Sequence, residues 1–199
     1  MTISSTEAAR EELINRLDTA VNAESDRVRS ENVKSVLKHA VERGDRLVEE
    51  QYLQPSEDHY ARHLLHRDPE GRYSVLVMVW APGQGTPLHD HNGKWCVECV
   101  YQGRNRVTSF EKVGEDEERE DIVYFEKRNE VVSGFADAGA LIPPYEHHIL
   151  HNDFDEKMVT LHVYDQELKE CNAFYPVNGE EGAYRREHKE LYYTSEIPD

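Results

Sequence analysis

The chain has 199 residues and carries 40 acidic against 23 basic side chains, a formal net charge of −17. This length suits one domain that can bury a hydrophobic core without disulfide bridges. So strong a negative charge argues against nucleic acid and anionic membrane surfaces as binding partners. We therefore expect a single domain over residues 1–199 that binds no nucleic acid and no membrane.

The sequence shows no sign of export. No stretch approaches the roughly 20 apolar residues of a membrane-spanning helix, and no basic start followed by an apolar run marks a signal peptide. The three cysteines, Cys96, Cys99 and Cys171, are too few and odd in number for a secreted disulfide scaffold. We expect a cytoplasmic protein.

Residues 4–50 have a helical pattern. Capping residues open the segment, and apolar residues recur at helical spacing from Leu13 onward. A second apolar stripe begins at Val33 and predicts a helix near residues 33–50. We expect residues 1–52 to form a pair of packing helices.

After Pro55 the pattern changes to short alternating segments separated by turns. Residues 59–67 and 72–81 predict one hairpin, and residues 94–101 and 106–113 predict a second. Further strand-like runs follow near residues 131, 140, 148 and 158–164.

The last thirty residues predict no further barrel strand. They hold a charged stretch, YRREHKELYY, which we interpret as a tail packed on the outside. Many short strands after a helical start favour a mainly β fold, in which residues 56–199 form a small β-barrel with its tail and the N-terminal α-helices pack against it.

A pair of histidines in TPLHDHNGKWCVECVYQG suggests a metal site. On one strand, residues two apart face the same way, so His89 and His91 can hold one ion inside a barrel. Chance produces the same pattern on surface strands. Cys96 and Cys99 are an odd number of places apart and face opposite sides, which argues against a zinc or redox pair and favours a packing role for Cys99.

The glycines around this pair extend the motif. The spacing from Gly83 through His89, His91 and Cys96 to Gly103 resembles the first motif of the cupin family. Cupins have a glutamate where this chain has Cys96, and every other fixed position matches.

A second cupin motif lies in IPPYEHHILHN, which supplies Pro143, a histidine and Asn152. Strand alternation puts His147 and His148 on opposite faces, so only one of them can be a ligand. The spacing favours His148, and His147 remains the alternative. Three neutral imidazoles keep the full charge of an ion and favour an anionic ligand such as a thiolate, unlike the common iron sites that add a carboxylate.

Four segments together resemble the cysteine dioxygenases, a group of thiol dioxygenases within the cupins. They are LHDHNGKWC, HHILHN, VTLHVY and HYARHLL, and the resemblance runs from about Tyr60 to about Phe174. It implies a cupin small β-barrel of the jelly-roll type. It also implies Fe(II) as the cofactor, held by His89, His91 and His148.

The segment VTLHVY places Thr160, His162 and Tyr164 on one strand face, as a hydroxyl, imidazole and phenol relay requires. An ordinary half-buried strand would show the same alternation. In the family the tyrosine and the motif cysteine can be joined by a thioether, so the resemblance implies a Cys96–Tyr164 crosslink. The family usually has serine at the position of Thr160, and either residue supplies a hydroxyl.

The segment HYARHLL places Tyr60 and Arg62 on one face. An arginine can bind a carboxylate with two parallel hydrogen bonds, and a tyrosine can add a third. A surface arginine on an edge strand is the alternative. The resemblance implies that both residues bind the substrate carboxylate, since members that prefer 3-mercaptopropionate carry glutamine in place of Arg62.

The resemblance therefore implies a monomeric enzyme that oxidises L-cysteine with O2 to cysteine sulfinic acid. Its partners would be a small thiol and O2. One alternative is a dioxygenase for 3-mercaptopropionate or mercaptosuccinate. The other is a non-catalytic metal-binding cupin, which leaves the aligned Thr160, His162 and Tyr164 unexplained.

Overall fold

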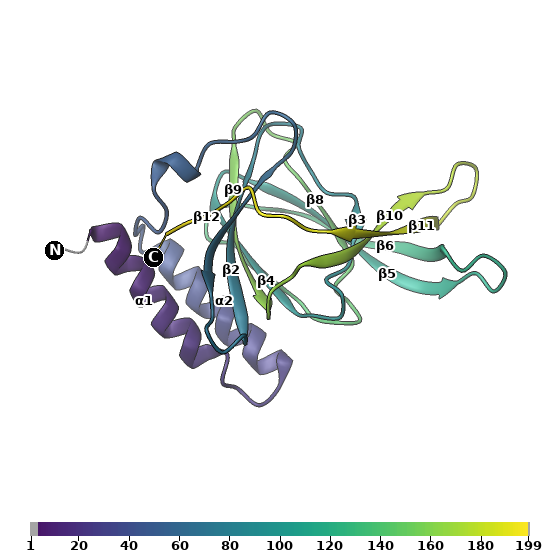
Figure 1. Ribbon diagram of the computed structural model, residues 1–199. Helices are drawn as coiled ribbons and strands as arrows, with labels where there is room; N and C mark the ends of the chain where they lie inside the picture. Colours follow the sequence, from purple (N-terminus) through teal and green to yellow (C-terminus); the bar gives the residue numbers. More distant parts are fainter. Residues whose placement is uncertain (1–3, 199) are drawn as a thin grey trace.

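The computed structural model describes residues 4–198 and shows two helices packed on one face of a β-barrel (Figure 1). The helices are α1 (Ser5–Ala20) and α2 (Asp26–Glu42), followed by a short 3-10 helix, η1 (Glu50–Tyr52). In the described part of the chain, no helix is long and apolar enough to cross a membrane.

Both helices begin at serine caps. The Ser4 hydroxyl accepts a hydrogen bond from the Glu7 amide, and the Glu7 carboxylate accepts one from the Ser4 amide. At α2 the Ser25 hydroxyl accepts a hydrogen bond from the Val28 amide, without a reciprocal bond. The predicted range 33–50 for the second helix is wrong. α2 starts at Asp26, and its polar first turns hid that start from the apolar pattern; it ends just before Gly44, whose φ is +72°.

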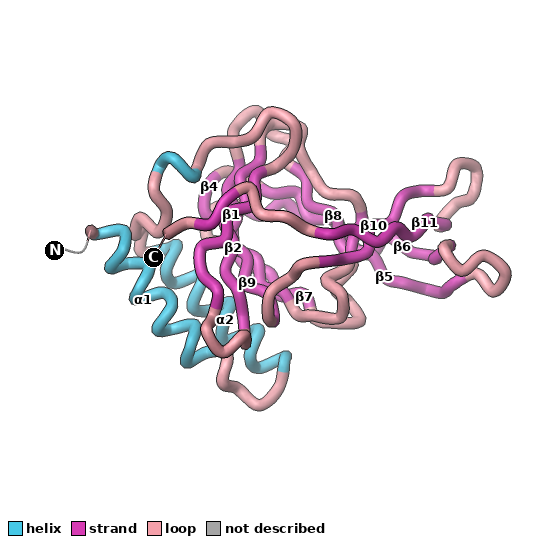
Figure 2. Tube along the Cα trace, viewed as in Figure 1, coloured by secondary structure: helices cyan, strands magenta, loops and turns pink. Residues whose placement is uncertain are grey.

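The strands form two sets (Figure 2). One is a six-stranded sheet in the order β12 (Ser195–Glu196), β1 (Ala61–Arg67), β2 (Tyr73–Trp80), β9 (Met158–Asp165), β4 (Cys96–Gln102) and β7 (Ala138–Leu141). The other closes on itself in the order β10 (Glu170–Pro176), β11 (Ala183–Glu190), β6 (Ile122–Ser133), β5 (Asn105–Glu115), β8 (His148–His151) and β3 (Leu88–His89). The predicted mainly β cupin barrel of the jelly-roll type with N-terminal helices is confirmed.

The two predicted hairpins have different outcomes. β1 and β2 pair antiparallel, as predicted. The second predicted hairpin is wrong, because β4 pairs with β7 and β9 while β5 pairs with β6 and β8. The chain changes sheets at Gly103, whose φ is +78° and whose backbone lies against Lys157.

The C-terminal stretch is also more ordered than predicted. Instead of an external tail, residues 170–190 form the β10–β11 hairpin, which pairs with β3 and β6 and completes the second set of strands. β12 then pairs in parallel with β1. The charged side chains of β11 hid this strand, because its outer face is exposed to solvent.

Both faces of β2 are buried. The strand lies between a core under the helices and a core inside the barrel. Val75, Val77 and Val79 pack toward the helices with Leu17 and Leu37. The alternate residues of the strand, Leu76, Met78 and Trp80, face the barrel interior with Cys96 and Tyr164. The helices therefore cover the sheet, and the interior face of the same sheet is left for a site.

We predict that Gly103→Ala lowers the free energy of unfolding by about 2 to 5 kcal/mol, from left-handed backbone strain and a steric clash together. A Cβ there would lie 2.6 Å from the Lys157 carbonyl oxygen. Gly71→Ala is the matched control, since Gly71 has a φ of +72° and open space around it, and should cost only about 1 to 2 kcal/mol. Equal losses in urea unfolding would contradict the steric account.

Candidate active site

Three histidines meet inside the barrel. His89, His91 and His148 each offer a ring nitrogen, and these atoms all lie within 4.8 Å of one another. The ring centroids are 4.6 to 5.2 Å apart. Among residues 4–198, this is the one cluster of histidine, cysteine or acidic side chains close enough to hold a metal ion.

Strand pairing brings two of these histidines together, and a turn supplies the third. His89 on β3 lies directly opposite His148 on β8. The HxH spacing suggested that His89 and His91 lie on one strand. β3 ends at His89, however, so His91 reaches the cluster from the turn that follows. Asp90 fixes this turn, because its carboxylate accepts hydrogen bonds from the backbone and side-chain amides of Asn172, each at 2.8 Å.

The electronic state of the cluster fits metal coordination. The Nδ1–H of His89 donates to the Pro87 carbonyl at 3.1 Å, which leaves its Nε2 lone pair free. Within the described residues, Nδ1 of His91 and both ring nitrogens of His148 are buried without a hydrogen-bond partner. Burial lowers the pKa of all three imidazoles, so they are neutral and able to coordinate a cation.

His147, the neighbour of His148, lies outside the histidine cluster. His147 packs between the rings of Phe125 and Phe174, with centroid distances of 5.0 and 5.7 Å, on the opposite side of the backbone from His148. The structure thus brings His148, and not His147, to His89 and His91.

The three residues of the expected relay are in contact. Thr160 Oγ1 lies 2.8 Å from His162 Nε2, and His162 Nδ1 lies 3.4 Å from the Tyr164 hydroxyl. The indole N–H of Trp80 donates to Thr160 Oγ1 at 3.0 Å. Burial lowers the pKa of His162 to about 3 and raises that of Tyr164 well above its usual value, so both are neutral.

Cys96 lies directly opposite Tyr164 in the β4–β9 ladder, and its Sγ is 4.0 Å from Nδ1 of His162. Directly opposite residues in an antiparallel pair project on the same side of the sheet. The ring of Tyr164 also lies 5.7 Å from that of His91, between centroids. Cys99 belongs to the other core, under the helices.

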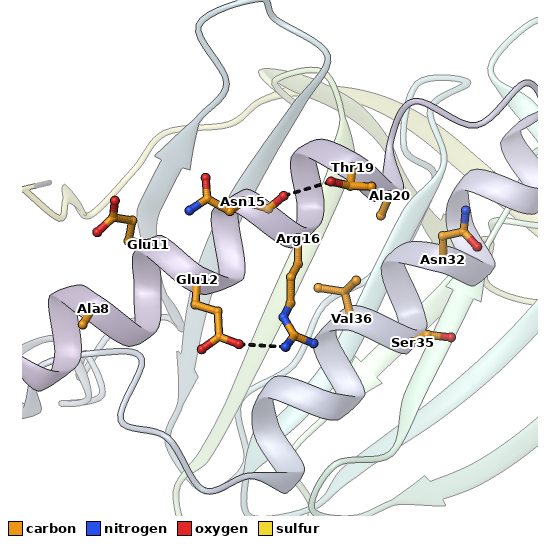
Figure 3. Close-up of a pocket in the computed structure, with 10 residues that line it drawn as sticks. All are labelled: Ala8, Glu11, Glu12, Asn15, Arg16, Thr19, Ala20, Asn32, Ser35 and Val36. Carbon is orange, nitrogen blue, oxygen red and sulfur yellow. Dashed lines mark hydrogen bonds and ion pairs between the residues drawn. The ribbon is translucent and has the colours of Figure 1, made fainter.

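A cavity of about 260 Å³ connects these groups to Tyr60 and Arg62. Its walls include His89, His148 and Tyr164. A wider groove of about 700 Å³ runs between α1 and α2, but it is a shallow solvent-facing depression lined by pairs such as Glu12–Arg16 (Figure 3). The smaller cavity is therefore the candidate active site.

Arg62 is held from the C-terminal end of the chain. Its Nη1 donates to the Tyr192 carbonyl at 3.1 Å, and the guanidinium lies 5.5 Å from the ring centroid of Tyr193. Its Nη2 is buried and has no hydrogen-bond partner among the described residues. The fold thus holds Nη1, and Nη2 is left for a ligand.

Sequence reasoning missed three contributions. Trp80 looks like a packing residue in the sequence, yet it both donates to Thr160 and stacks on Tyr60 at 4.2 Å between centroids. The backbone carbonyl of Tyr192 accepts a hydrogen bond from Arg62, and no pattern of side chains in the sequence reveals such a contact. Glu98 faces His162 from β4, and the one acidic residue in the apolar run WCVECV was the signal for it.

Comparison with known proteins agrees with this arrangement. The family model for cysteine dioxygenase type I matches residues 4–176. The chain belongs to this family. Cysteine dioxygenase type 1 from Homo sapiens is 26% identical over 116 residues, and that from Bos taurus is 24% identical over 116. These matches cover 58% of the chain and 55% of each relative, so the chain spans about half the length of the curated relatives it matches.

Among solved structures, a cupin-2 domain from Rhodospirillum rubrum superimposes with a TM-score of 0.45 at 17% identity, over 66% of this chain and 72% of that one. A protein from Thermus thermophilus gives a TM-score of 0.44 at 17% identity, over 58% of this chain and 91% of that one.

We predict that His148→Ala weakens binding of Fe(II) or Co(II) by more than the roughly 10- to 100-fold that loss of an outer partner costs. His147→Ala should leave the metal affinity nearly unchanged, because His147 packs against phenylalanine rings. Anaerobic calorimetric titration of both variants measures the difference. Loss of binding in His147→Ala alone would contradict the assignment.

Proposed function

We propose that the protein is an Fe(II)-dependent dioxygenase that oxidises L-cysteine with O2 to cysteine sulfinic acid. One observation carries the proposal. The cavity that His89 and His148 line is also lined by a buried arginine, Arg62, with an uncommitted N–H group. A cluster fit to hold a metal and a carboxylate-binding group therefore share one small space.

His89, His91 and His148 are the residues that would hold the iron. Their neutral, partnerless nitrogens fit it, because imidazole is a ligand for iron and these buried nitrogens gain little from any other contact. When bound, Fe(II) supplies the coordination positions at which a thiolate and O2 meet. With no carboxylate among the three ligands, the site retains the positive charge that favours a thiolate.

Arg62 and Tyr60 would bind the substrate carboxylate. The chain has 40 acidic side chains, yet no ion pair involves Arg62 within residues 4–198. A buried cation without an acidic partner is costly, and a bound carboxylate relieves that cost with charge-assisted hydrogen bonds. Tyr60, which stacks on Trp80, lines the same cavity.

The cavity also limits the size of the substrate. Its volume of about 260 Å³ lies below the range of roughly 300 to 1,000 Å³ that drug-sized ligands occupy. Met78, Leu150 and Leu168 give it apolar walls beside the polar groups. A compact amino acid with a thiol matches these dimensions and chemistry.

Tyr164 would provide a neutral phenol beside the reacting groups. His162, itself held by Thr160, orients its hydroxyl. A thioether between Cys96 and Tyr164, as the family resemblance implies, would fix the phenol further, and the opposed positions of the two residues support it.

The experiment for this function is O2 uptake by the iron-loaded protein with L-cysteine, 3-mercaptopropionate and mercaptosuccinate in parallel. Uptake that is fastest with L-cysteine is expected. Faster uptake with either of the other thiols would keep the site and change the substrate. Bound iron without uptake for any thiol would favour the non-catalytic metal-binding cupin.

We predict that Arg62→Gln lowers kcat/KM for L-cysteine by about 10- to 100-fold, because charge-assisted hydrogen bonds to the carboxylate are worth about 1.5 to 3 kcal/mol. With cysteamine, which has the thiol and amine but no carboxylate, the variant should match the wild type. Steady-state O2 uptake measures both.

Arg67→Gln is the matched control for this prediction. Arg67 lies on the same strand but is 45% exposed and paired with Glu167 and Glu196, so its loss should leave kcat/KM unchanged. An equal loss for both substrates in Arg62→Gln would contradict a carboxylate-binding role and indicate a structural one.

We also predict that protein exposed to iron, L-cysteine and O2 becomes lighter by the mass of H2, as a C–S bond replaces one S–H and one C–H bond and O2 takes the two electrons and protons. Peptide mass spectrometry should locate the link between the Cys96 and Tyr164 peptides. The Cys96→Ser variant should lack the link. The Cys99→Ser variant should retain it, because Cys99 lies in the core under the helices and not beside Tyr164.

A further inference from the structure

Glu98 is a buried acidic residue in the barrel wall that the proposed function does not use. It lies directly opposite His162 in the β4–β9 ladder, and its Oε2 is 4.0 Å from His162 Nδ1. Oε2 is buried and has no hydrogen-bond partner among residues 4–198. A buried carboxyl oxygen without a partner destabilises the folded protein. Its position next to His162 therefore suggests a function in the relay.

A second cavity lies beside Glu98, between β4, β7 and β9 of one sheet and β5 and β6 of the other. Its volume is about 240 Å³, and both Glu98 and Thr160 line it together with polar residues such as Asn105 and Ser133. The cavity reaches Glu98 because the residue opposite on β7 is Gly139, which has no side chain to fill the space. His162 and Tyr164 line the active-site cavity instead, so the relay and Glu98 together separate the two.

The proposed reaction releases a proton that needs a route out. Oxidation of a thiol follows RSH + O2 → RSO2⁻ + H⁺: the S–H bond breaks, both oxygen atoms join sulfur, and the four electrons that sulfur loses reduce O2. The substrate itself occupies the active-site cavity. The Tyr164 hydroxyl and Glu98 Oε2 both lie near Nδ1 of His162, at 3.4 and 4.0 Å, so a proton taken up by the Tyr164–His162 pair has an ionisable group beside it.

We propose that Glu98 is the proton-exchange residue of this relay, linking His162 to the second cavity. This inference rests on the proposed function. A carboxyl group suits the task because it accepts a proton on one oxygen while it releases another from the second. Glu98 acts through His162 and does not contact the substrate.

The surroundings of Glu98 support exchange. Burial raises the pKa of Glu98 to about 8, so the carboxyl group holds a proton at neutral pH and can lose it within the working range of an enzyme. The titratable groups around it are His162 and Tyr164 on β9, Cys96 and Cys99 on its own strand, and Asp137 at the cavity wall. No basic side chain lines the second cavity within the described residues.

The test compares Glu98→Gln with Glu98→Asp. Glutamine keeps the size and polarity of the side chain but cannot exchange a proton, whereas aspartate keeps the carboxyl group and is shorter. We expect kcat for L-cysteine to fall at least about tenfold in Glu98→Gln, with KM changed less than about twofold, and to be partly restored in Glu98→Asp. Glutamine as active as aspartate, or more so, would overturn the proposal in favour of packing.

Ser133→Ala is the matched control, since Ser133 lines the second cavity without an ionisable group and should leave kcat unchanged. Inactive wild-type protein would refute the proposed function rather than this inference, so a second readout needs no activity. Infrared difference spectra of the metal-free wild type and Glu98→Gln should show a carbonyl band of the protonated acid that disappears between about pH 6 and about pH 10. A band absent, or unchanged across that range, would overturn the proposal.

Discussion

The antiparallel pairing of β9 with β4 and β2 sets the arrangement of the barrel interior. It places Tyr164 opposite Cys96 and His162 opposite Glu98, and it brings Thr160 to the indole of Trp80. Because opposed residues share a face, one register fixes every one of these contacts, and a slip of one residue would turn them all toward the helices. The helices cover the other face of the sheet and shield it from solvent.

The site is built from polar groups that the fold alone does not satisfy. The imidazole of His148 and one nitrogen of Arg62 are buried without partners in the described residues. Each such group destabilises the folded protein unless a ligand completes it. The cavity between them therefore suits two opposite charges: His89, His91 and His148 would hold a cation, and Arg62 would bind the carboxylate of a small thiol.

The sequence predicted the parts that follow from spacing within a single segment. Strand alternation separated Cys96 from Cys99 and aligned Thr160 with His162, and the structure has the same placement. It could not predict which strands pair, because β4 and β5 look like a hairpin locally and the change of sheet depends on the packing of Gly103 against Lys157. It also could not reveal the hydrogen bond from the Arg62 side chain to the Tyr192 carbonyl, because the two residues are 130 positions apart and the acceptor is a backbone atom.

Under the proposed function, the histidine cluster and Arg62 together direct both atoms of O2 to the sulfur of L-cysteine. Mass spectrometry of the product formed by iron-loaded protein under ¹⁸O2 tests it most directly. The expected product is cysteine sulfinic acid with both oxygen atoms labelled. Cystine as the only product, or a sulfinate that carries oxygen from water, would contradict it.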